Sequence, residues 1–169
     1  MEVNAKLPPL AAAVYLRYVS FLNWLQKILL LGIRLVWGFL FAQAGWGKWQ
    51  DIGKVTGFFT DLDIPLPMLN AYVVATTELV GGIFLLLGLF GRLTPIPLII
   101  AMVVAYVTTE QEALGALAKG DFDPFLTAAP FLFLFASLLI LVFGPGCLSV
   151  DRLLQKFFAV KNTERPRQA

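Results

Sequence analysis

Residues 71–91 read AYVVATTELVGGIFLLLGLFG, an apolar stretch with a single charged residue, Glu78. The stretch is about as long as the roughly 17–25 residues that a helix needs to cross the hydrocarbon layer of a bilayer. A charge near the middle of such a helix costs about 2.5–3.5 kcal/mol on insertion scales. The stretch therefore predicts a membrane-spanning helix in which Glu78 needs a polar partner.

The composition of the whole chain also indicates a membrane protein. Of its 169 residues, 59% are hydrophobic and only 14% are charged, whereas a soluble domain is about half apolar and about a quarter charged. The chain has no histidine and one cysteine, Cys147. Zinc sites and haem ligation normally need His or clustered Cys, so we expect no metal site and no covalently bound cofactor. The basic residues are too scattered for a nucleic-acid surface.

Four apolar stretches have a length suited to spanning helices. Only Gly91 and Arg92 separate the second from the third, so these two helices are expected to form a tight antiparallel hairpin. We therefore predict an all-α membrane protein with four transmembrane helices in an up-down bundle. The predicted spans are residues 24–46, 71–90, 93–108 and 125–143. The predicted parts of the chain are a cytoplasmic N-terminal or interfacial segment (1–23), the four-helix transmembrane domain (24–146), and a cytoplasmic amphipathic helix and tail (147–169).

The distribution of the 13 Lys and Arg residues predicts the orientation of the chain. Short loops on the cytoplasmic side of a membrane carry an excess of these residues. The side with both termini would carry Lys6, Arg17, Lys27, Arg92, Arg152, Lys156, Lys161, Arg165 and Arg167, and the other side Lys48, Lys54 and Lys119. Both termini are therefore expected in the cytoplasm. The first residues do not have the pattern of a cleavable signal peptide, since Pro8, Pro9 and Arg17 interrupt the apolar run.

Segments outside the spans have the spacing of amphipathic helices. Ser149 is suited to cap the N-terminus of a helix with the sequence VDRLLQKFF, residues 150–158, and residues 10–27 are a less regular candidate. A third candidate is a short helix on or in the outer interface. Its apolar face would consist of Val55, Phe58, Phe59 and Leu62. We therefore expect interfacial amphipathic helices around the bundle.

Two charged residues fall deep inside the predicted spans, Arg34 and Glu78. Each shares a helical face with small residues, because Gly38 and Gly45 follow Arg34, and Gly82 follows Glu78, at helical spacing. Small-residue faces are where membrane helices approach one another closely. Counted at about 1.5 Å per residue from the predicted span ends, the two charges lie at depths that differ by about 3 Å. We therefore predict an Arg34–Glu78 pair.

This pair has two interpretations. It fixes the register of the two helices, or it lines a polar pocket for a ligand headgroup or a proton. At the outer end of the first span, residues 41–49 read FAQAGWGKW, which places a lysine that can reach the interface beside two tryptophans. The candidate ligand-binding residues are Arg34, Gly45, Trp46, Lys48 and Glu78.

Four stretches together resemble the DoxX/DoxD-like family of small four-helix bacterial membrane proteins. They are RLVWGFLFAQAGWGK (34–48), FFTDLDIPLP (58–67), NAYVVATTELVGGIFLLLGLFGR (70–92) and FGPGCLSVDRLL (143–154). The positions that look like the family's recurring ones are Arg34, Gly45, Lys48, Glu78, Gly82, Arg92, Gly146, Ser149 and Asp151. Many members have a His near the end of the first span, and FAQAGWGK has none, so a role that rests on that His is not expected here.

The resemblance implies a place in the bacterial cytoplasmic (inner) membrane and a link to quinones. Some members are membrane subunits of quinone-linked oxidoreductases, including thiosulfate:quinone oxidoreductase. The chain is therefore expected to be a membrane subunit, itself not necessarily catalytic, that supports quinone-linked redox chemistry with a partner redox protein. Arg34, Lys48 and Glu78 would then bind a quinone or relay its protons.

Two alternative functions stay open. The first is a small-molecule transporter, for which four spans are few unless the chain forms a homo-oligomer. The second is a non-catalytic scaffold or assembly subunit that holds a peripheral partner through its cytoplasmic ends. In the scaffold the charged pair would only stabilise the helices.

Overall fold

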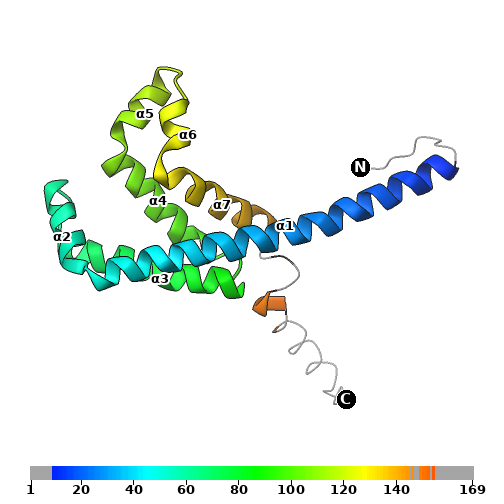
Figure 1. Ribbon diagram of the computed structural model, residues 1–169, viewed down its shortest axis with the longest axis horizontal. Helices are drawn as coiled ribbons and strands as arrows, with labels where there is room; N and C mark the ends of the chain where they lie inside the picture. Colours follow the sequence, from blue (N-terminus) through cyan, green and yellow to red (C-terminus); the bar gives the residue numbers. More distant parts are fainter. Residues whose placement is uncertain (1–8, 145, 147–148, 153, 155–169) are drawn as a thin grey trace, which may run out of the picture.

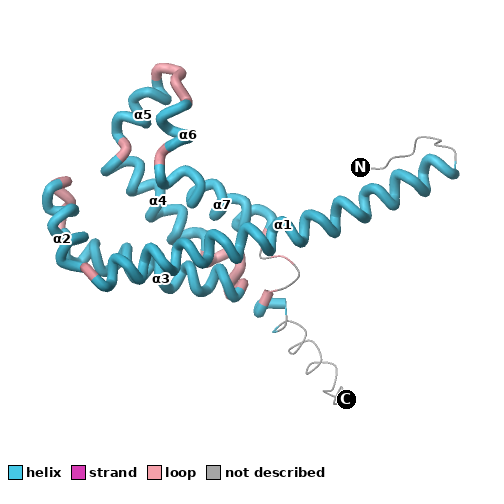
Figure 2. Tube along the Cα trace, in the orientation of Figure 1, coloured by secondary structure: helices cyan, strands magenta, loops and turns pink. Residues whose placement is uncertain are grey.

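The computed structural model describes residues 9–144, 146, 149–152 and 154, and their regular structure is entirely helical (Figures 1 and 2). The helices are α1 (Pro9–Gln50), α2 (Ile52–Asp61), α3 (Pro67–Leu87), α4 (Pro95–Thr109), α5 (Gln111–Ala118), α6 (Asp123–Thr127) and α7 (Ala129–Phe143). The predicted all-α class is therefore confirmed.

Prolines, a glycine and an aspartate set the helix ends that position the site. α3 begins at Pro67 and α4 at Pro95, because proline has no amide hydrogen to leave unbonded in the first turn. α3 ends at Leu87 and is capped by Gly88, whose φ of 66° is the left-handed conformation that glycine adopts most easily. α2 begins after Asp51, whose carboxylate accepts a hydrogen bond from the amide of Lys54 at 3.2 Å.

α1 and α3 run side by side in opposite directions, and their backbones touch (Figure 1). A Cβ added to Gly82 of α3 would lie 2.7 Å from the carbonyl oxygen of Gly38 in α1. A Cβ added to Gly45 of α1 would lie 2.8 Å from the carbonyl oxygen of Ala75 in α3. Small residues permit this close approach, as the small-residue faces in the sequence predicted. The glycine contacts fix the register of the two helices.

Four helices surround a common apolar core. α1 packs on α3, α3 on α4, α4 on α7 and α7 on α1. Buried core residues come from each of them, namely Phe41, Leu85, Leu98, Met102 and Ile140. α5 and α6 form a pair that stands away from this core (Figure 1).

The prediction of four membrane spans is not confirmed. Within the described residues, α1 and α3 are long and apolar enough to cross a bilayer, and a third span results only if α4 and α5 count as one, although they meet at 87°. α7 has 15 residues, or about 22 Å of helix, which is shorter than a hydrocarbon layer of about 30 Å. α7 is short because Ala128 is extended (ψ 142°) and separates it from α6 inside the predicted span 125–143.

α1 is longer than the predicted first span. It continues without a break from Pro9 to Gln50, across the boundary predicted between residues 23 and 24. Its 42 residues correspond to about 63 Å of helix, about twice the hydrocarbon thickness. Figure 1 shows its N-terminal part extending beyond the other helices.

Part of the predicted C-terminal structure lies outside the described residues. Cys147 and most of the predicted surface helix at 150–158 are among these positions. The helix predicted around Phe58 and Phe59 is present as α2.

Candidate functional site

Glu78 forms an ion pair with Lys48 across the α1–α3 contact. The Lys48 ammonium donates a hydrogen bond to Oε2 of Glu78. Glu78 is 4% exposed on α3, whereas Lys48 lies in the last turn of α1 with 30% of its side chain exposed. The helix register explains the pairing, since the contact of Gly45 with Ala75 and Leu79 brings the last turn of α1 beside Glu78.

The predicted Arg34–Glu78 pair is wrong, since Glu78 has Lys48 as its partner. Arg34 is buried at 3% exposure, but its guanidinium lies at the other end of α3. A Cβ added to Gly88 would lie 2.6 Å from Nη1 of Arg34. Gly88 is ten residues, or about 15 Å, along α3 from Glu78. The sequence-based depths failed because they were counted from assumed span ends, whereas the register is set by the Gly38–Gly82 contact.

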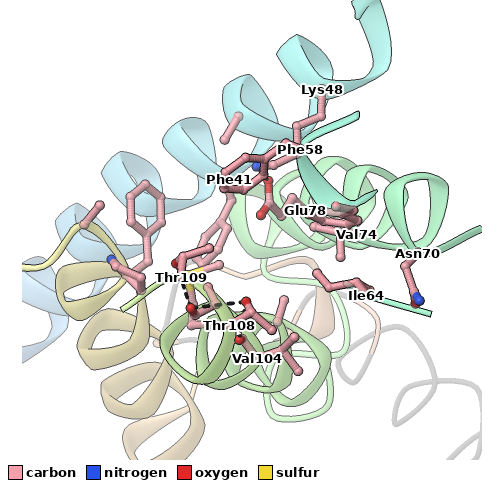
Figure 3. A pocket seen from close by; sticks show the side chains of 18 of the residues that line it. Phe41, Lys48, Phe58, Ile64, Asn70, Val74, Glu78, Val104, Thr108 and Thr109 are labelled. Carbon is pink, nitrogen blue, oxygen red and sulfur yellow. Dashed lines mark hydrogen bonds and ion pairs between the residues drawn. The ribbon is translucent and has the colours of Figure 1, made fainter. Parts of the chain in front are cut away.

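The Lys48–Glu78 pair forms the charged part of an otherwise largely apolar cavity of about 500 Å³. The cavity lies between α1, α2, α3, α4 and α7, and Figure 3 shows Lys48 and Glu78 pointing toward one another at its wall. The side chains that give it its character are the pair together with Phe41, Phe58, Phe59, Val74, Met102, Ala105 and Phe133. A charged pair with a buried carboxylate in such surroundings is a candidate binding site.

Aromatic rings form much of the apolar wall. Phe41 and Phe133 meet edge to face, with ring centroids 4.7 Å apart. Phe58 and Phe59 of α2 bring two further rings to the cavity wall, with centroids 6.2 Å apart. This arrangement suits a flat, apolar ring system as ligand.

Other polar side chains at the cavity are occupied by local hydrogen bonds. The side-chain amide of Asn70 donates to the carbonyl oxygen of Pro65 at 2.6 Å and so holds the α2–α3 loop. The hydroxyls of Thr108 and Thr109 donate to carbonyl oxygens of their own helix at 2.8 and 2.7 Å. Among the lining residues, Lys48 and Glu78 are therefore best placed to recognise a polar group.

Two other predicted ligand residues have different surroundings. Trp46 is 56% exposed and is not part of the cavity wall. Gly45 contacts the α3 backbone, so it serves helix packing. Gly82 does the same from α3.

The sequence does not identify the aromatic and α4 walls of the cavity. It predicts an interfacial helix for Phe58 and Phe59, and it places Phe133 and Met102 inside predicted spans. The helical spacing of Met102, Ala105 and Thr109 on α4 is a signal for a shared face. That spacing does not say which helix it faces.

The remaining predicted motif residues gather at the end of α3 that lies far from Glu78. Asp151 accepts hydrogen bonds from the amides of Phe90 at 2.9 Å and Gly91 at 2.7 Å. Its own amide donates to the carbonyl oxygen of Gly88 at 3.3 Å, and Ser149 is buried beside Gly88. These contacts tie the segment after α7 to the turn between α3 and α4.

Arg92 and Gly146 lie beside this turn. Arg92 is exposed, and a Cβ added to Gly144 would lie 3.5 Å from its Nε. Gly146 has a φ of 79°, which favours glycine. Within the described part of the chain, no group of three or more His, Cys, Asp or Glu side chains could hold a metal ion.

The long apolar helices and the charged pair inside the helix packing define a helical membrane protein. The chain belongs to the DoxX family, whose sequence model matches residues 29–111. The match includes both members of the Lys48–Glu78 pair and confirms the resemblance seen in the sequence.

Two relatives show how far the similarity extends. The "Putative oxidoreductase CatD" of Bacillus subtilis (strain 168) is 29% identical over 124 residues, which cover 73% of this chain and 85% of the relative. The "Uncharacterized membrane protein Rv3486" of Mycobacterium tuberculosis (strain ATCC 25618 / H37Rv) is 35% identical over 130 residues, which cover 73% of this chain and 80% of the relative. No solved structure matches the chain.

Proposed function

We propose that the protein is a quinone-binding membrane subunit that works with a separate redox protein. The observation that carries this proposal is the Lys48–Glu78 pair in the wall of an apolar, aromatic cavity of about 500 Å³. This volume is within the range of about 300–1,000 Å³ typical of small-molecule sites. A relative is named as an oxidoreductase, which supports a redox role.

The residues of the cavity fit the chemistry of a quinone ring. A quinone has a flat ring for aromatic contacts and carbonyl oxygens that accept hydrogen bonds. Phe41, Phe133 and Phe58 would contact the ring, and the ammonium of Lys48 would donate to a carbonyl oxygen. An apolar tail would leave between helices toward the bilayer.

Glu78 would hold or release a proton beside that carbonyl oxygen. A quinone, when bound, takes up two electrons and two protons. The chain has no histidine and one cysteine, so we assign the supply of electrons to the partner redox protein. Lys48 and Glu78 would orient the ring and pass protons, while the apolar walls exclude water.

We further propose that the protein lies in the bacterial cytoplasmic membrane with both termini in the cytoplasm. The excess of Lys and Arg on the side of the termini supports this orientation. The cavity would then open near the outer face of the membrane, since Lys48 lies at the end of α1 far from the N-terminus.

Quinone binding is tested with the full chain purified in mild detergent. Short-chain ubiquinone and menaquinone analogues are titrated, and binding is followed by quenching of tryptophan fluorescence and by mass spectrometry of retained quinone. We expect saturable binding that Glu78→Gln and Lys48→Met each weaken by about tenfold or more, the loss of one charge-assisted hydrogen bond. The matched controls Glu112→Gln and Lys119→Met change exposed residues of the α5 region and should bind normally. Absence of saturable binding by the folded wild-type chain would overturn the proposal.

A further inference from the structure

A second cavity, of about 730 Å³, lies at the opposite end of the α1–α3 pair from Glu78. Its walls come from α1, from the α3–α4 turn and from the segment after α7. The polar and charged side chains that line it are Asn23, Gln26, Lys27, Arg92, Ser149, Asp151 and Arg152. None of them lines the proposed quinone cavity.

The charges around this cavity are predominantly positive. Lys27, Arg92 and Arg152 come from three separate segments and all line its walls. Asp151 is the carboxylate among the lining residues, and its two oxygens accept the hydrogen bonds from Phe90 and Gly91. None of these three cations forms an ion pair with a carboxylate of the described residues.

Apolar side chains lie beside the cations. Leu30 is buried at the cavity wall, whereas Phe90, Leu93 and Phe143 are 55%, 63% and 53% exposed. Phe90 has a φ of 49°, a left-handed conformation that is unusual for a residue with a Cβ. The Asp151 carboxylate holds the Phe90 amide in this conformation, which leaves the ring at the edge of the cavity.

From this combination we infer that the cavity binds the phosphate headgroup of an anionic phospholipid. Lys27, Arg92 and Arg152 would contact the phosphate, Asn23 and Gln26 would hydrogen-bond the glycerol headgroup, and Phe90, Leu93 and Phe143 would contact the acyl chains. Basic pockets beside membrane helices on the cytoplasmic side are typical sites for such lipids. A soluble phosphate would use the cations but would leave the exposed apolar side chains in contact with water.

The test uses native mass spectrometry of the full chain in detergent with added phosphatidylglycerol or phosphatidylcholine. We expect retention of phosphatidylglycerol in preference to phosphatidylcholine. Each of Lys27→Gln and Arg92→Gln should weaken phosphatidylglycerol binding by about fivefold, since a cation near an anionic membrane surface contributes about this factor. The control Lys54→Gln, on exposed α2 surface at the other end of the molecule, should have no effect.

Further measurements distinguish lipid binding from binding of a soluble anion and from misfolding of a variant. Glycerophosphoglycerol and inorganic phosphate should compete only weakly, because they lack acyl chains. Tight binding of either one, equal retention of the two lipids, or normal phosphatidylglycerol binding by both variants would overturn the inference. If Arg92→Gln does not fold, Lys27→Gln decides, since Lys27 is exposed on α1. Quinone titration of the same variants should be unchanged, which keeps this site separate from the proposed quinone site.

Discussion

Gly82 of α3 and Gly38 of α1 lie so close that a Cβ on Gly82 would be 2.7 Å from the carbonyl oxygen of Gly38. Because backbone meets backbone here, neither side can yield by rotating a side chain. The contact therefore determines which residues of the two helices face each other, including Lys48 and Glu78.

We predict that Gly82→Ala destabilises the protein by about 1–3 kcal/mol, the usual range for overpacking a tight interface. The matched control is Gly32→Ala in α1, where an added Cβ has no atom within 4 Å. This control should be neutral or stabilising by up to about 1 kcal/mol, because alanine has a higher helix propensity than glycine. Thermal unfolding in detergent measures both variants. Equal shifts of the unfolding temperature would contradict a tight backbone contact at Gly82.

A second prediction concerns the Lys48–Glu78 pair. Lys48→Met should destabilise the protein by about 3 kcal/mol, since it leaves a buried carboxylate without its partner. The double variant Lys48→Met/Glu78→Leu should recover most of this loss, because apolar residues of similar size replace the pair. Unfolding measurements on the two single variants and the double variant give the coupling. Additive effects of the two substitutions would show that the pair does not interact.

The same double variant separates stability from function. It should fold and yet lose quinone binding, because the polar recognition groups are gone while the aromatic walls remain. Tryptophan quenching by a short-chain ubiquinone is the measurement. Normal binding by the stable double variant would show that the pair has a structural role only.

A third prediction follows from the position of Arg34 beside Gly88. A cation at the C-terminus of a helix is stabilising, by up to about 2 kcal/mol in partly buried geometries. We expect Arg34→Met to lower the unfolding temperature but to leave quinone affinity within about twofold, since α3 separates the two sites by about 15 Å. Loss of quinone binding at unchanged stability would place Arg34 in the ligand site.

A fourth prediction concerns Asp151 and the turn that follows α3. Asp151→Asn removes the charge from two hydrogen bonds to backbone amides, each worth about 1.5–3 kcal/mol when charged. Hydrogen–deuterium exchange at Phe90 and Gly91 should become faster, while exchange in α5 stays unchanged. The exposed Glu112→Gln is the control. Unaltered protection at both amides would contradict the capping role.

The sequence predicts the helical class and one side of the site. The spacing of Glu78 and Gly82 predicts a buried α3 face, and the structure buries both. The sequence does not identify the partner of Glu78, because Arg34 and Lys48 lie on the same face of α1 and only the α1–α3 register decides between them. The cavity walls from α2, α4 and α7 depend on packing between distant segments, which local spacing does not determine.

The rigid contact between α1 and α3 has a consequence for how the quinone cavity exchanges its contents. Two of its walls cannot part without losing the glycine contacts, whereas α2 contains no buried residue and is tied to its neighbours by short links. We therefore expect movement of α2 to open and close the cavity, while the Lys48–Glu78 pair stays in place. Spin labels on α2 and α3 would then report opening while the distance between α1 and α3 stays constant. The residence time of a ligand would depend on how fast this small helix moves, and its affinity on the pair behind it.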